Sequence, residues 1–226
     1  MNVIKKYFKF VVGILLLPVC FYGTLALYKQ LDNIKLLAAK QTYFLIGAVA
    51  YLILHSLFFK PMRMYIFGHE AMHAIPVWFF GGKVKGFKVS KKGGSVKTTK
   101  SNFIIALFPY FLPVYTIVCV VAYFVVNIFY NLSGYVHYFI ALIGFSLAFH
   151  IVMTVDFLKT KQPDLMETGY IFSLSLIYIV NLCVVALILM FIFNNEVSFT
   201  DFMKSGYNLT KDFYIAVFRQ LFAVRR

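Results

Sequence analysis

Long apolar stretches alternate with short polar connections along this chain. A run of about 20 apolar residues is long enough to cross a bilayer as a helix. The pattern predicts transmembrane helices over residues 10–28, 41–59, 62–80, 102–130, 135–158 and 168–195. Inside lipid each backbone N–H and C=O group needs a partner, which a helix supplies within its own segment. We therefore predict an all-α polytopic membrane protein with about six transmembrane helices.

The fourth and fifth predicted helices come from one stretch, 101–155, that contains no Asp, Glu, Lys or Arg. This stretch is too long for a single helix, and Asn131-Leu132-Ser133-Gly134 supplies a break in its middle. Pro109 and Pro113 lie near the start of the fourth helix. Because proline lacks a backbone N–H and clashes with the preceding turn, we expect the helix to kink or to be interrupted there.

The two ends of the chain carry different signals. The first apolar run is long for a signal peptide and is followed by no clear small-residue cleavage site, which favours an uncleaved transmembrane helix. Tyr207–Val224 has apolar residues at helical spacing opposite charged ones and predicts an amphipathic interfacial helix. We divide the chain into N-terminal transmembrane helices (1–60), a transmembrane core (61–195) and a C-terminal interfacial tail (196–226).

A strongly basic segment follows the third predicted helix. Residues 83–100 contain seven lysines and no acidic residue, with Gly93-Gly94 between two stretches that carry Val84 and Val96. Valines alternating with lysines around a glycine pair are typical of a short β-hairpin. A solvated basic loop explains the same residues, and both alternatives stay open.

Composition supports a membrane protein. Hydrophobic residues make up 62% of the 226 residues and charged residues 13%, whereas a soluble domain has roughly a quarter of its residues charged. The net charge of +14 comes from residues beside apolar runs, so we expect lipid headgroups rather than nucleic acid as partners. Cys20, Cys119 and Cys183 lie inside apolar runs and predict buried thiols without disulfides. Basic residues are divided almost equally between the two sides of the predicted helices, so the positive-inside rule favours neither membrane orientation.

Candidate chemistry is concentrated in the third predicted helix, which contains His69-Glu70-Ala71-Met72-His73. Histidines at positions i and i+4 lie on one face of a helix and can bind one metal ion. The glutamate between them is placed to act as a general base toward water. Ionisable groups are costly at membrane depth, which favours a functional role for all three.

A zinc hydrolase site needs a third protein ligand. The candidates are His55, His137, His150, Asp156, Asp164 and Glu167. Asp164 is favoured because Pro163 predicts a helix start, which places this carboxylate beside the C-terminal end of the motif helix. An ordinary acidic residue in a first helical turn explains it equally well without a metal. Asp156 is the runner-up ligand, and the histidines outside the motif are more typical of packed or interfacial side chains.

These residues resemble the site-2 protease family of intramembrane zinc metalloproteases. The resemblance covers about residues 60–175 and includes the motif, Gly81-Gly82-x-Val84, Gly93-Gly94-x-Val96, the proline-bearing helix and Asp164 with Gly169. It implies that His69, His73 and Asp164 bind Zn²⁺ and that Glu70 activates water.

We therefore expect an intramembrane zinc metalloendopeptidase, a hydrolase that cleaves membrane-protein substrates in a bacterial cell membrane. The segment around Val84 and Val96 would bind an extended stretch of substrate by adding it as a strand. An inactive relative that binds or retains membrane proteins is the main alternative. A metal or proton transporter is a further one, but its ionisable groups would be spread over several helices.

Overall fold

The computed structural model describes residues 3–32, 34, 38–90 and 93–222, and most of these residues are helical. The elements are α1 (Val3–Leu31), α2 (Ala39–Leu57), α3 (Met62–Phe79), β1 (Val84–Ser90), β2 (Gly93–Thr98), α4 (Phe103–Phe111), α5 (Val114–Phe129), the 3₁₀ turn η1 (Ser133–Tyr135), α6 (Val136–Leu158), α7 (Pro163–Thr168), α8 (Tyr170–Ile192) and α9 (Phe199–Phe222). They form two compact units, Lys35–Thr168 and Met1–Ile34 with Gly169–Arg226. The divisions after residues 60 and 195 stay predictions.

Several helices are long and apolar enough to cross a membrane. Val3–Leu31, Ser133–Leu158 and Tyr170–Ile192 each meet this description alone. Two further pairs meet it only together: α2 with α3, which are bent by 118°, and α4 with α5, which are bent by 64°. A helical protein with three to five candidate membrane spans agrees with the predicted class.

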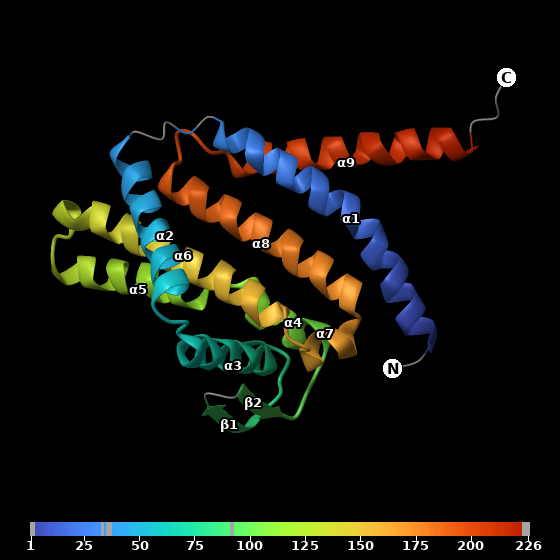
Figure 1. The fold of residues 1–226 in the computed structure, drawn as a ribbon, viewed down its shortest axis with the longest axis horizontal. Coiled ribbons are helices and arrows are strands. Elements are labelled where there is room, and N and C mark those ends of the chain that lie inside the picture. Colours follow the sequence, from blue (N-terminus) through green and yellow to red (C-terminus); the bar gives the residue numbers. More distant parts are fainter. Residues whose placement is uncertain (1–2, 33, 35–37, 91–92, 223–226) are drawn as a thin grey trace. The chain divides into compact units, whose positions relative to one another are not determined.

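In the unit Lys35–Thr168, α2 crosses α6 at close range, and α5 lies beside α6 (Figure 1). Two glycines permit the crossing. A Cβ atom on Gly47 would lie 1.8 Å from the carbonyl oxygen of Ala141, and one on Gly144 would lie 2.1 Å from that of Phe44. Small residues allow such backbone approach between membrane helices. Beyond the crossing, Tyr51, Tyr65, Phe149 and Met153 form a buried cluster.

Proline and glycine divide helices at two places. Pro113 separates α4 from α5, so the predicted fourth helix is interrupted. The predicted helix start at Pro163 is confirmed, but the helix that begins there is not the last apolar one. Pro163 begins the short helix α7, and Gly169, with φ of 108°, separates α7 from α8. A positive φ suits glycine, because it lacks a Cβ atom.

The basic segment forms the antiparallel hairpin that one of the two alternatives predicted. Phe87 pairs with Val96 and Val84 pairs with Thr98, with an irregularity between Val84 and Gly86. The turn at residues 91 and 92 lies outside the described residues. The hairpin packs against α3 (Figure 1), partly through the ring of Phe87 against that of Phe67.

The other unit consists of α1, α8 and α9. Backbone approach again involves a glycine, since a Cβ atom on Gly13 would lie 2.7 Å from the backbone nitrogen of Phe172. Cys20 and Cys183 of this unit and Cys119 of α5 are free cysteines, as predicted, and each is partly buried. Helix α9 begins before the predicted start at Tyr207, and Val224 lies outside the described residues. Phe202 of α9 packs on Ala26 and Ala186. The location of helix α9 at a membrane interface stays a prediction.

Candidate metal centre

Helix α3 brings the two motif histidines to one face. It begins directly after Pro61 and contains one full turn between His69 and His73, whose ring centroids lie 5.0 Å apart. His69 is 5% exposed and Glu70 6% exposed. Buried polar side chains are costly without partners, so His69 and Glu70 need a ligand or a hydrogen-bond network.

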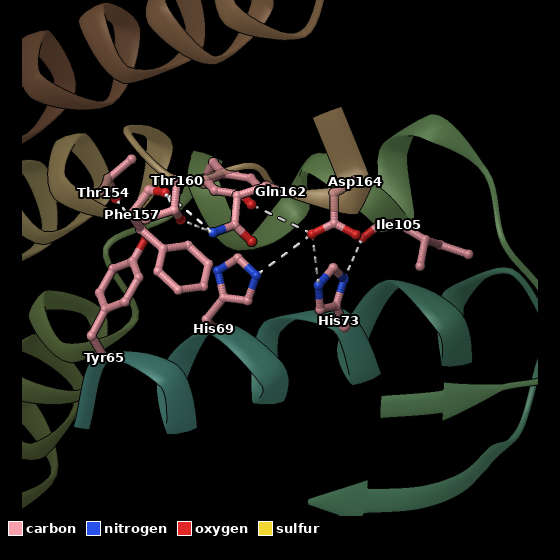
Figure 2. A network of polar contacts seen from close by, with 10 residues as sticks. Tyr65, His69, His73, Ile105, Thr154, Phe157, Thr160, Gln162 and Asp164 are labelled. Carbon is pink, nitrogen blue, oxygen red and sulfur yellow. Dashed lines mark hydrogen bonds and ion pairs between the residues drawn. The ribbon is translucent and has the colours of Figure 1, made fainter. Parts of the chain in front are cut away.

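Asp164 of α7 completes a triad with these histidines. Its Oδ2 atom lies 3.7 Å from Nε2 of His69 and 3.5 Å from Nε2 of His73 (Figure 2). Ligand atoms from all three residues lie within 4.8 Å of one another. In a tetrahedral zinc site with bonds of about 2.0–2.2 Å, donor atoms lie roughly 3.4 Å apart. The spacing therefore fits a metal ion held between the three side chains.

The hydrogen bond of His73 favours metal binding. Nδ1 of His73 lies 2.9 Å from the carbonyl oxygen of Ile105, and a carbonyl only accepts, so Nδ1 carries the proton. A neutral His73 then presents the lone pair of Nε2 toward the Asp164 carboxylate. Two acceptors facing each other repel unless a proton or a metal cation lies between them, and in the absence of a metal a protonated His73 donates to Asp164. Two imidazoles and one carboxylate form a donor set that suits zinc.

His69 is held differently, by aromatic packing. Its ring contacts those of Tyr65, Tyr110 and Phe157, with centroids 5.9, 4.9 and 4.9 Å away. Among the described residues, its buried Nδ1 has no hydrogen-bond partner. The two histidines are thus oriented by different contacts, one polar and one steric.

The electrostatics of Asp164 follow from its neighbours. Burial raises the pKa of this carboxyl, but the hydrogen bonds and charges of His69 and His73 outweigh burial. The pKa of Asp164 therefore lies well below its usual range, and the side chain is a carboxylate at neutral pH. An ionised carboxylate is the form that binds metal.

A polar cavity of about 240 Å³ opens beside the triad and contains the Glu70 side chain. Its lining includes Ser95, Val96, Thr98, Ser101, Ile105, Ala106, Phe157, Gln162 and Glu167. The predicted substrate-binding residue Val96 therefore lies in its wall. Val84, the second predicted substrate-binding residue, does not line this cavity.

Of the remaining candidates, Glu167 lies in the cavity wall but outside the triad, and the others lie elsewhere. Asp156, the runner-up ligand, accepts from Nζ of Lys60 at 2.6 Å and of Lys159 at 2.7 Å, and His55 lies 3.2 Å away. Its carboxylate is thus occupied by cations. The ring of His137 is tilted against that of Tyr43, with centroids 4.9 Å apart, and His150 is buried on α6.

The sequence did not reveal three contacts of this site. The Ile105 carbonyl accepts from His73, the Tyr110 ring lies against that of His69, and Gly94 lies against the Glu70 side chain. No local pattern marks them, because each depends on α4 or β2 packing against another element.

Comparisons with protein-family models, with curated proteins and with solved structures gave no match.

Proposed function

We propose that this protein is an intramembrane zinc metalloendopeptidase. The observation that carries the proposal is the convergence of His69, His73 and Asp164 beside a polar cavity that contains Glu70. Two histidines, a carboxylate and a free glutamate are the groups that metal-assisted peptide hydrolysis uses. The apolar helices that carry them favour substrates within the bilayer.

His69, His73 and Asp164 would hold the metal, which supplies Lewis acidity to activate water and polarise a carbonyl. Glu70 takes a proton from the attacking water. It then delivers this proton to the nitrogen of the leaving amine. Phe157 and the rings around His69 keep one wall of the site apolar, which strengthens the electrostatic contacts inside it.

The hairpin is the proposed substrate-binding element. β2 contributes Val96 and Thr98 to the cavity. Among the described residues, β1 and β2 form a two-stranded sheet, so each has one edge without a strand partner. An extended substrate segment that adds to such an edge has its peptide bonds unwound from helix. Val84→Pro and Val96→Pro remove backbone donors from the sheet. Unchanged cleavage by both folded variants would overturn this role.

We also propose that the chain crosses a bacterial cell membrane about six times, with α2 and α3 as separate crossings. It also retains the resemblance to the site-2 protease family, which the motif, the glycine-bounded hairpin and Asp164 support.

The test is cleavage of a model transmembrane substrate by the protein reconstituted with zinc in lipid vesicles. Wild type should cleave, Glu70→Gln should not, and Glu196→Gln serves as a charge-matched control outside the cavity. Zinc binding without Glu70-dependent cleavage would favour a factor that binds or retains membrane proteins. Zinc flux into the vesicles would favour a transporter.

A further inference from the structure

One short helix, α4, contacts every member of the triad. The Ile105 carbonyl accepts from His73. At the other end of α4, the ring of Tyr110 lies edge-on to that of His69, and its hydroxyl donates to Oδ2 of Asp164 over 3.4 Å. Tyr110 alone thus touches two of the three residues.

The environment of Tyr110 gives this contact its importance. Tyr110 is completely buried, and a buried hydroxyl strongly prefers a hydrogen-bond partner. Asp164 lies on a helix of six residues, and its side chain remains 26% exposed. A carboxylate on so short a support needs contacts beyond its own helix to keep one orientation. The phenol contacts the same oxygen, Oδ2, that faces both histidines.

We propose that Tyr110 is the positioning residue of the metal centre, which orients the Asp164 carboxylate toward His69 and His73. This inference rests on the proposed metal site. A carboxylate oxygen has two lone-pair directions, so Oδ2 accepts from Tyr110 while it binds a metal. Groups that hydrogen-bond to metal ligands in this way fix ligand geometry and raise metal affinity.

The start of α4 supports the same role. Asn102 caps the helix by accepting from the backbone nitrogen of Ile105 at 2.8 Å, which fixes the residue whose carbonyl holds His73. The break at Pro113 then ends the rigid element shortly after Tyr110. The interrupted span thus places a capped helix against the triad.

The test compares zinc affinity of the full chain, by chelator competition in detergent, for wild type, Tyr110→Phe and Tyr51→Phe. Tyr51 is a matched control, because it is also completely buried and its hydroxyl contacts His55 outside the triad. Tyr110→Phe should weaken zinc binding about 10- to 100-fold, and Tyr51→Phe should not weaken it. The absorption spectrum of the Co²⁺-substituted protein should change only in Tyr110→Phe.

The Asp164→Asn background shows whether Tyr110 acts through Asp164. There, Tyr110→Phe should add little further loss, since coupled residues are not additive. Equal zinc affinity in Tyr110→Phe and Tyr51→Phe would overturn the inference and leave the proposed function intact. The inference would also be overturned if Tyr110→Phe reduced zinc affinity equally in the wild-type and Asp164→Asn backgrounds. A wild-type protein that binds no zinc would overturn both proposals.

Discussion

Gly94 of β2 lies directly against the side chain of Glu70. A Cβ atom built on Gly94 would be 2.4 Å from Cγ and 2.5 Å from Oε1 of that glutamate. The hairpin therefore reaches the proposed general base through a position where only glycine fits. The element proposed to bind substrate and the group proposed to move protons are in direct contact.

Gly94→Ala should reduce cleavage while zinc content stays unchanged. The methyl group must displace either Glu70 or the hairpin, and a displacement of about 1 Å near the chemistry costs on the order of 100-fold in rate. Gly86→Ala in β1 is the control, because its Cβ atom would meet only ordinary contacts with Lys97. Cleavage assays of both variants check this, and equal rates would contradict it.

Asp164→Asn should release more zinc than Asp156→Asn. Asp164 lies beside both histidines, whereas Asp156 is held by Lys60 and Lys159. Loss of a ligand should cost at least about as much as loss of an outer contact, 10- to 100-fold in affinity. Metal analysis of the purified variants measures this. The opposite ranking would make Asp156 the preferred third ligand.

Acidification should release zinc through the histidines. The pKa of Asp164 is held below its usual range, so this carboxylate stays ionised after His69 and His73 begin to take up protons. Protons compete with the metal for both imidazoles, and zinc affinity therefore falls as pH falls. Equilibrium dialysis at a series of pH values measures retention. A zinc affinity that does not change as pH falls through the ordinary pKa range of histidine, about 6.5, would argue against histidine ligands.

Gly144→Ala should destabilise the crossing of α2 and α6. Its Cβ atom would lie 2.1 Å from a backbone oxygen of α2, so the helices must move apart, and overpacking of this kind costs about 1–3 kcal/mol. Gly134→Ala is a suitable control, because nothing lies within 4 Å of its Cβ position. Thermal unfolding in detergent should show a lower midpoint for Gly144→Ala alone.

Much of the fold is predictable from the sequence, because lipid restricts an apolar run to a helix. The start of α3 at Met62 and the interruption before Val114 agree with the prolines that precede them. The pairing of His69 with His73 is equally local, since a helical turn brings residues four apart to one face. The hairpin remained ambiguous, because lysines and valines around glycines suit both a strand pair and a loop.

The sequence by itself determined the apolar helices and the pairing of His69 with His73 on one helix face, because both follow from periodicities within one segment. Pro163 in the sequence favoured Asp164 over Asp156, but only the tertiary structure shows what each carboxylate contacts. In the structure, Asp164 faces the two motif histidines, whereas Asp156 contacts two lysines. The roles of Tyr110, Ile105 and Gly94 also needed the structure. Each depends on contacts between segments far apart in the chain, and local propensity contains no information about such packing.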